Sequence, residues 1–204
     1  MSQFALPLDW RQRNEPLQFI AGESNRLALR HLDHPALWPV RTSLLIGPRK
    51  SGKSLLGRAF AARTGALLID NAEAMDEESL FHAWNNAQES GRYQLWIADA
   101  APPQWQISLP DLASRMGATP TIAIQPPDER LLLDIIAAHL ERHGLLVDLD
   151  TRAYLAPRLE RDYVVADRFI DLALVLAAGR QGPFTIPQAR AVLQQLDPTV
   201  IDQS

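Results

Sequence analysis

The stretch SLLIGPRKSGKSLLGRAFAART, residues 43–64, decides the fold class of this chain. An apolar run at 44–46 is typical of a short buried strand, and apolar residues recur at helical spacing over 55–62. Between these two patterns lies a turn that matches the phosphate-loop pattern G-x-x-x-x-G-K-[ST]. Its matching residues are Gly47, Gly52, Lys53 and Ser54. A strand, a phosphate loop and a helix in this order predict a nucleotide-binding α/β fold.

The residue types in this loop suit phosphate chemistry. Glycines let successive backbone N–H groups converge on phosphate oxygens, and the following helix adds unpaired amides and the positive end of its dipole. In this pattern the lysine reaches the β- and γ-phosphates, while the serine hydroxyl binds magnesium. We therefore expect ADP or ATP with Mg²⁺ as ligands, with Ser54 on the metal. The residues expected to hold the nucleotide here are Gly47, Pro48, Arg49, Lys50, Ser51, Gly52, Lys53, Ser54 and Leu55.

The composition excludes several other classes of protein. Hydrophobic residues make up 47% of the 204 residues, which is enough for a buried core, and no apolar run is long enough to cross a membrane. Cysteine is absent, which excludes disulfides and cysteine-ligated zinc and fits a cytoplasmic location. The net charge of −4 gives no indication of a DNA-binding surface. The only two lysines, Lys50 and Lys53, both fall in the loop, which indicates that at least one position needs a compact ammonium.

An acidic residue at a strand end normally holds magnesium in P-loop hydrolases, and a second acid usually activates water. Two segments of this chain could supply the first acid: ALLIDN, which ends at Asp70–Asn71, and QLWIADA, which ends at Asp99–Ala100. Each offers one carboxylate without an adjacent second one, and either aspartate could instead cap the loop that follows it. We therefore expect weak or absent ATP hydrolysis by this chain alone.

The pattern of elements changes after the pair Pro126–Pro127. Before it, strand and helix patterns alternate, whereas after it helical patterns follow one another without a strand pattern. This order suggests an AAA+ ATPase, in which a parallel-sheet base and a helical lid enclose the nucleotide. The predicted parts are an amino-terminal peptide at 1–14, an α/β base at 15–125 and a small all-helical lid at 126–204.

Three segments together resemble the bacterial replication initiator DnaA. They are FIAGESNRLAL at 19–29, the phosphate loop, and LPDLASR at 109–115 followed by a strand and PPDERLLLDII. The resemblance covers about residues 15–195 and leaves no room for the DNA-binding domain of DnaA. The chain is therefore similar to the Hda group, DnaA-related proteins that consist of the ATPase domain alone. That group is a negative regulator of replication initiation: docked on the sliding clamp, it stimulates hydrolysis of DnaA-bound ATP.

The resemblance implies roles for residues around the nucleotide. Phe19 and Ile20 correspond to the segment that lines the adenine pocket, and Asp70 corresponds best to the magnesium-binding acid. Asp99 then falls near the strand that senses the γ-phosphate. Arg168 matches the lid arginine that touches the phosphates, although an ion pair with a nearby acid would also explain it. The family usually has an extra strand and helix before the position of Asp70, so we expect a shortened sheet here.

The resemblance also assigns an arginine finger. Arg115, the last residue of LPDLASR, would enter the ATP site of DnaA. A cationic fork against a transferring γ-phosphate is worth roughly 10³ to 10⁵ in rate. The alternative from the residues alone is a surface arginine on a short helix.

The apolar segment QFALPL, residues 3–8, resembles the short peptide with which the family binds the sliding clamp. An extended peptide could place a polar anchor and two apolar plugs in a surface pocket, and a proline would limit the entropy lost. The segment could instead pack on the base as a strand or staple. The matching residues are Gln3, Leu6, Pro7 and Leu8.

Two other interpretations of the phosphate loop stay open. The chain could be a stand-alone P-loop ATPase or small-molecule kinase, which would turn over ATP without a protein partner. It could also be a nucleotide-insensitive replication adaptor, which would bind neither ADP nor ATP. For the Hda-like interpretation the expected partners are the sliding clamp and DnaA. The chain could also form a homo-oligomer, and no binding to a membrane is expected.

Overall fold

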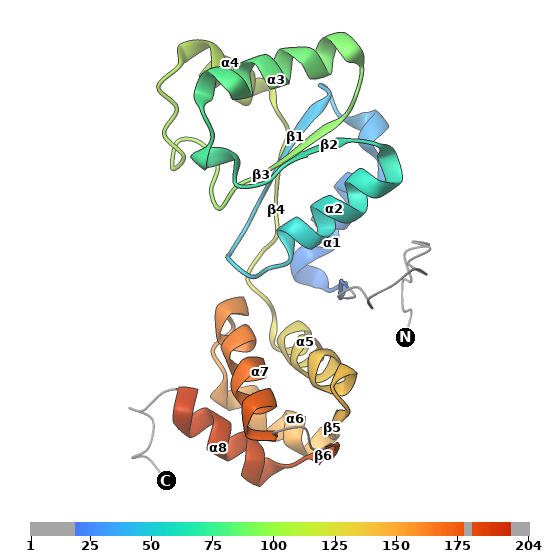
Figure 1. The fold of residues 1–204 in the computed structure, drawn as a ribbon, viewed down its shortest axis with the longest axis vertical. Helices are drawn as coiled ribbons and strands as arrows, with labels where there is room; N and C mark the ends of the chain where they lie inside the picture. The colour runs from blue at the N-terminus through green and yellow to red at the C-terminus, as the bar shows by residue number, and fades with distance from the viewer. Residues whose placement is uncertain (1–18, 178–180, 197–204) are drawn as a thin grey trace. The chain divides into compact units, whose positions relative to one another are not determined.

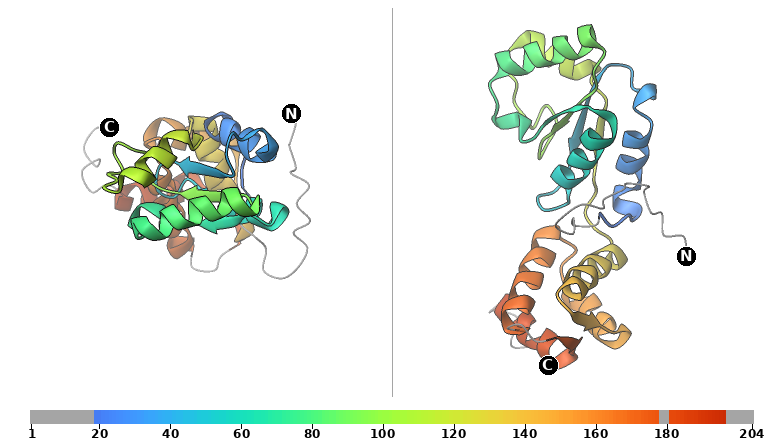
Figure 2. Two further views of the ribbon diagram at one scale, coloured as in Figure 1. Left: turned by 90° about the horizontal axis from the view of Figure 1, so that it is seen from above. Right: turned by 45° about the vertical axis from the view of Figure 1, so that its right-hand side comes forward.

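A computed structural model describes residues 19–177 and 181–196 of the 204-residue chain. The chain divides into two compact units, Met1–Gln125 and Pro126–Ser204 (Figures 1 and 2). This boundary lies at the Pro126–Pro127 pair, where the sequence pattern changes. The two units are described separately below.

The first unit is built on a parallel β-sheet, as predicted. Within the described residues it has four strands in the order β2-β3-β1-β4, so the phosphate-loop strand β1 lies between β3 and β4. Leu44 of β1 pairs with Trp96 of β3 on one side and with Thr121 of β4 on the other. The strands are β1 (Thr42–Ile46), β2 (Leu67–Ile69), β3 (Gln94–Ile97) and β4 (Thr121–Ala123).

Helices cover both faces of this sheet, which explains why β1 and β3 are buried without alternation along the strand. The helices are α1 (Glu23–Asp33), α2 (Lys53–Thr64), α3 (Glu77–Ser90) and α4 (Pro110–Ala118), and short 3₁₀ turns span Pro35–Leu37 (η1) and Ala72–Ala74 (η2). Leu44 and Trp96 pack with Leu80 of α3 and Leu112 of α4 in one core cluster. On the other face α2 approaches so closely that a Cβ on its Gly57 would lie 2.7 Å from Ile97 Cδ1. Figure 1 shows α3 and α4 on one side of the sheet and α1 and α2 on the other.

Local sequence signals mark both ends of α3. Asp76 precedes the helix, and its carboxylate accepts a hydrogen bond from the N–H of Ser79 at 2.9 Å. Gly91 follows the last turn with φ of 69°. A capped helix start and a glycine stop are local signals, so they could be located from sequence alone.

A half-buried histidine, His31, ties α1 to the sheet. His31 donates from Nε2 to Ser43 Oγ at 2.7 Å, because the Ser43 hydroxyl itself donates to the Pro120 carbonyl at 3.0 Å. Its ring also stacks on Trp38 with the centroids 4.9 Å apart. Burial lowers the pKa of His31 below its ordinary value of 6.5.

The lowered pKa of His31 predicts acid sensitivity of the first unit. The unfolded chain binds a proton at His31 as the pH falls below about 6.5, while the folded chain resists it. The free energy of unfolding should therefore decrease between pH 6.5 and the lower folded pKa. The free energy of unfolding, measured by chemical denaturation at several pH values in this range, should depend less steeply on pH for His31→Gln than for the wild type. His82→Gln, at an exposed position on α3, is the matched control, and equal slopes for all three proteins would contradict the prediction.

The second unit is mostly helical, around a core that includes Leu140, Leu155, Phe169 and Phe184. The rings of Phe169 and Phe184 meet edge to face, with centroids 6.2 Å apart. The helices are α5 (Glu129–Arg142), α6 (Leu149–Leu155), α7 (Tyr163–Ala177) and α8 (Ile186–Leu196), and a 3₁₀ turn (η3) spans Ala156–Arg158.

The prediction that this unit is all-helical is wrong in one detail. Two strands, β5 (Leu145–Val147) and β6 (Gly182–Phe184), form a two-stranded parallel sheet. Each strand has only three residues, which is too short for an alternating pattern to be recognised in the sequence.

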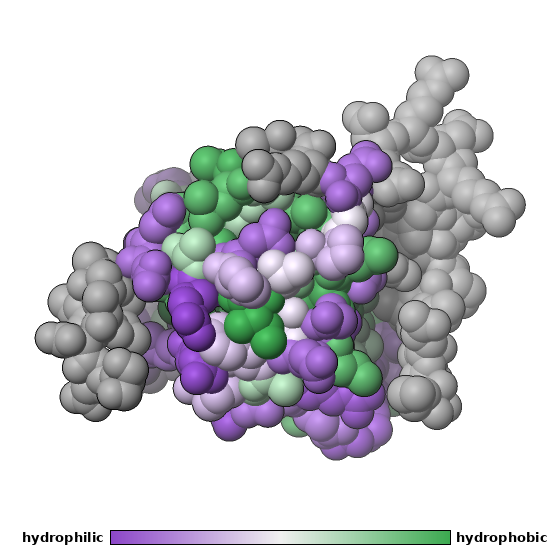
Figure 3. Space-filling model, turned by 90° about the horizontal axis from the view of Figure 1, so that it is seen from below, coloured by the Kyte–Doolittle hydropathy of each residue, from purple (hydrophilic) through white to green (hydrophobic). Residues whose placement is uncertain are grey.

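The surface carries scattered apolar side chains. In the second unit, Leu146 of β5 and Leu149 of α6 are 59% and 83% exposed. Figure 3 shows one face of the molecule, on which apolar and hydrophilic residues are interspersed. No helix in the described part of the chain has both the length and the apolar character needed to cross a membrane.

Candidate nucleotide-binding site

Two glycines shape the loop between β1 and α2. Gly47 has φ of 150°, and a Cβ there would lie 2.7 Å from the carbonyl oxygen of Ile124. Gly52 has φ of 87°, and a Cβ there would lie 3.0 Å from Cε2 of Phe19. Both positions combine a conformation that other residues rarely adopt with a lack of space. The contact at Gly52 also places Phe19 directly against the loop.

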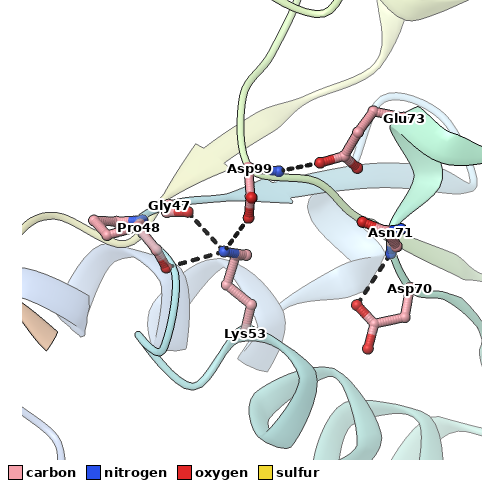
Figure 4. Close-up of polar contacts among 7 residues, drawn as sticks. All are labelled: Gly47, Pro48, Lys53, Asp70, Asn71, Glu73 and Asp99. Atoms are coloured by element: carbon pink, nitrogen blue, oxygen red, sulfur yellow. Dashed lines mark hydrogen bonds and ion pairs between the residues drawn. The ribbon is translucent and has the colours of Figure 1, made fainter. Parts of the chain in front are cut away.

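Lys53, the first residue of α2, is buried and turns its ammonium back onto the loop. Its Nζ donates to the carbonyl oxygens of Gly47 and Pro48 at 2.6 and 3.0 Å. The third acceptor is Oδ1 of Asp99 at 3.0 Å (Figure 4). An ammonium has three hydrogens to donate, so all of them are engaged.

Ser51 provides a polar group without a partner. The residue is 6% exposed, and its Oγ makes no hydrogen bond within the described residues. A buried hydroxyl without a partner is destabilising by about 1–3 kcal/mol, so a ligand or water that hydrogen-bonds to Ser51 Oγ would be favourable here. Together with Lys53 and the amino terminus of a 12-residue helix, it makes a site that fits an anionic phosphate chain.

The remaining predicted loop residues are more exposed. Arg49 and Lys50 lie on the surface, and Lys50 adopts a left-handed conformation with φ of 64°. Pro48, Ser54 and Leu55 are half-buried. The structure therefore brings together Phe19, the two glycines and Lys53, while the exposed loop residues face solvent.

Of the two candidate aspartates, Asp99 is the one that contacts the phosphate loop. It follows β3, which pairs directly with β1, so the ends of these two parallel strands meet at one edge of the sheet. Asp70 follows β2, which lies one strand further away. Asp70 is exposed, its Oδ1 accepts the N–H of Asn71 at 3.1 Å, and it stands apart from Lys53 in Figure 4. Its role as a magnesium ligand, with Ser54, stays a prediction.

Among residues 19–177 and 181–196, no cluster of three or more histidine, aspartate or glutamate side chains is arranged to hold a metal ion. A magnesium ion at this site would therefore depend on the oxygens of the nucleotide and water as well as on Ser54 and one carboxylate.

Glu73 is a site residue that the sequence did not reveal. It lies on η2 after β2, and its Oε1 accepts the backbone N–H of Asp99 at 2.8 Å (Figure 4). Its Oε2 is buried and makes no hydrogen bond within the described residues. Because the contact joins positions 26 residues apart, no local pattern could have located it.

Asn25 is a second residue that the sequence analysis passed over, although it lies in the quoted FIAGESN segment. Its Oδ1 accepts the N–H of Gly22 at 2.9 Å, and its Nδ2 donates to the carbonyl of Ile20 at 2.8 Å. Asn25 is 3% exposed. Its amide therefore fixes the chain that carries Phe19 and Ile20 beside the loop.

Arg115 lies on α4, away from α2, and α3 holds it in place. Its Nε donates to Oδ1 of Asn85 at 2.9 Å. Its guanidinium carbon lies 5.0 Å from the ring centroid of Phe81 and 5.3 Å from that of Trp84. Within the described residues its two terminal nitrogens make no hydrogen bond, so this end of the guanidinium fork is available to another group.

The start of α4 is anchored by Glu77 of α3. Its carboxylate accepts the N–H groups of Ser108 and Leu109, the shortest of these bonds being 2.6 Å. Charge-assisted bonds of this kind are stronger than neutral ones. They set the position of α4, and with it Arg115, relative to α3.

The other predicted residues lie elsewhere. Arg168 is an exposed residue of α7 in the second unit, and it forms no ion pair within the described part of the chain. The suggested clamp-binding residues lie outside the described residues: Gln3, Leu6, Pro7 and Leu8.

Comparison with known proteins defines the fold. No protein-family model matches the chain. Domain III of the replication initiation protein DnaA from Thermotoga maritima superimposes with a TM-score of 0.71 at 18% identity, covering 90% of this chain and 98% of that one. The AAA domain of FIGL-1 in complex with ADP superimposes with a TM-score of 0.63 at 12% identity, covering 91% and 85%. The chain therefore has the α/β fold of AAA+ P-loop proteins.

Within that class the fold is DnaA-like. AMPPCP-bound DnaA from Aquifex aeolicus superimposes with a TM-score of 0.63 at 17% identity, covering 79% of this chain. The chain spans 64% of the length of that longer DnaA structure. At these identities the likeness extends to the fold, whereas the function of this chain has to be argued from its own site.

Proposed function

We propose that this chain is an Hda-like regulator that binds ADP or ATP and stimulates hydrolysis of DnaA-bound ATP. The nucleotide would lie on the loop 47–55, with Lys53 on its phosphates, Ser54 and Asp70 on magnesium, and Phe19 beside the base. Support comes from the glycine geometry, the buried Lys53 and the unpartnered hydroxyl of Ser51. Neighbours with the same fold are described as bound to AMPPCP or ADP, which agrees with this ligand class.

The observation that carries the regulatory proposal is the arrangement of Arg115. Its Nε is held by Asn85 and its plane lies over two aromatic rings, while its terminal nitrogens have no hydrogen bond within the described residues. It also lies on α4, on the sheet face opposite to α2 and Lys53. A guanidinium oriented in this way can offer its fork to a phosphate of another protein.

The chemistry is hydrolysis of the β–γ phosphoanhydride of ATP held by DnaA. Water adds to the γ-phosphorus, the bond to the β-phosphate oxygen breaks, and ADP and phosphate result. Arg115 would stabilise the charge that develops on the transferred phosphoryl group. Water activation would come from DnaA, so the single carboxylates at Asp70 and Asp99 would not limit the reaction.

A clamp-binding role for QFALPL rests on the sequence resemblance. The wild type should accelerate hydrolysis of the ATP bound to DnaA more strongly with DNA-loaded clamp than without it. A variant with Gln3→Ala, Leu6→Ala and Leu8→Ala should lose the clamp-dependent part of the acceleration while binding ADP as before, because the peptide is separate from the loop in sequence.

Leu149→Ala is the matched control for the peptide variant. It removes an apolar side chain that is 83% exposed on α6, so it should keep the full clamp-dependent acceleration. Equal stimulation by the peptide variant and the wild type in the presence of clamp would rule out a clamp-binding role for QFALPL.

A further inference from the structure

The ammonium of Lys53 has no donor left for a ligand. Its three hydrogen bonds go to two loop carbonyls and to the carboxylate of Asp99. A phosphate oxygen that binds Lys53 must therefore replace at least one of these acceptors. The three acceptors differ in how easily phosphate can displace them.

The two carbonyl oxygens belong to Gly47 and Pro48, whose backbone positions are set by the loop itself. Gly47 in particular is packed against the Ile124 backbone. Asp99 is different, since its side chain is 58% exposed and can turn into solvent. It is also the only anion of the three, so it forms an ion pair with the ammonium, as a phosphate would.

Glu73 sets the position of the Asp99 backbone, and through it the position from which the Asp99 carboxylate reaches Lys53. Its Oε1 accepts the backbone N–H of Asp99 at 2.8 Å, which holds the end of β3 rather than the Asp99 side chain. With its other oxygen buried, Glu73 has little freedom to reorient. A fixed backbone at Asp99 places its side chain where the carboxylate reaches Lys53 Nζ at 3.0 Å.

We propose that Asp99 is an internal counter-ion that competes with nucleotide phosphate for Lys53, and that Glu73 is the positioning residue that holds it there. This inference rests on the proposed nucleotide binding. Asp99 thereby lowers the affinity of the site and sets how readily nucleotide is exchanged. Glu73 acts only through Asp99 and makes no contact with the ligand.

Titration calorimetry with ADP tests the competition. Asp99→Asn should bind ADP about tenfold more tightly than the wild type, because one charge-assisted hydrogen bond no longer has to be exchanged. Asp111→Asn is the matched control: it removes the same charge from α4 at an exposed position without an ion pair in the described part of the chain. Its ADP affinity should stay within about twofold of the wild type.

A double-mutant cycle tests the positioning role. Glu73→Ala should tighten ADP binding by about threefold when Asp99 is present, and it should not change the ADP affinity further in the Asp99→Asn background. Glu73→Gln retains a carbonyl oxygen that accepts the Asp99 N–H, so it should restore the wild-type affinity. A purely structural role of Glu73 would instead change ADP binding equally in both backgrounds. Thermal unfolding of each variant verifies that it is folded.

The outcomes separate this inference from the proposed function. If the wild type binds ADP and Asp99→Asn binds it no more tightly, the internal counter-ion is refuted while nucleotide binding stands. If Glu73→Ala has the same effect with and without Asp99, the positioning role is refuted. If neither the wild type nor Asp99→Asn binds ADP, both this inference and the proposed nucleotide binding are wrong.

Discussion

Replacing Lys53 by alanine is expected to weaken ADP and ATP binding by about 100-fold or more. The change removes the ammonium that would meet the phosphates, and charge-assisted hydrogen bonds contribute about 1.5–3 kcal/mol each. Lys53→Arg should not restore binding, because a planar guanidinium is larger than the buried ammonium that Gly47 and Pro48 enclose. Titration calorimetry with each nucleotide measures the effect.

Arg58→Ala controls for a general loss of positive charge near the loop. Arg58 is an exposed residue of the same helix, α2, and its loss should leave the affinity within about twofold of the wild type because solvent and salt screen its charge. Unchanged nucleotide affinity in a folded Lys53→Ala variant would mean that the loop does not bind phosphate. A nucleotide-insensitive adaptor would then be the better description of the chain.

If the chain stimulates DnaA as proposed, replacing Arg115 by alanine is expected to abolish that stimulation, with a loss of about 10³-fold or more in the stimulated rate. ADP binding by the chain itself should not change, because Arg115 is held on α3 and α4 rather than at the loop. Arg115→Lys keeps the charge but loses the fork, so it should recover little of the stimulation. Release of phosphate from ATP-loaded DnaA, measured with saturating clamp, gives the rates.

Two further measurements make the Arg115 prediction specific. Asn85→Ala should reduce the stimulation less than Arg115→Ala, since it frees the guanidinium without removing it. Arg58→Ala should stimulate like the wild type. Stimulation at the full rate by Arg115→Ala would exclude the finger role, and turnover of ATP by the chain without DnaA would instead favour a stand-alone P-loop enzyme.

Local patterns predicted the elements of the fold well. The strand, loop and helix over 43–64 are β1, the phosphate loop and α2. Asp76 and Gly91 mark the limits of α3, because capping residues act on their own neighbours in sequence. The three-residue strands β5 and β6 were missed, since so short a pairing is stabilised by tertiary packing and leaves no periodic signal.

The candidate site was only partly predictable. The sequence indicated both Asp70 and Asp99 as acids at strand ends, but it could not determine which strand lies next to β1. Strand order places Asp99 there and leaves Asp70 one strand away. The same limit applies to Arg115, whose position depends on the packing of α4 against α3.

The sequence by itself determined the phosphate loop, because its residues are contiguous and glycine is the residue that tolerates the backbone conformation at positions 47 and 52. Only the tertiary structure decided what surrounds that loop. The contacts of Asp99 with Lys53 and of Glu73 with Asp99 join residues 46 and 26 positions apart. Such contacts arise from strand order and from the path of the chain between strands, and spacing along the sequence does not encode either of them.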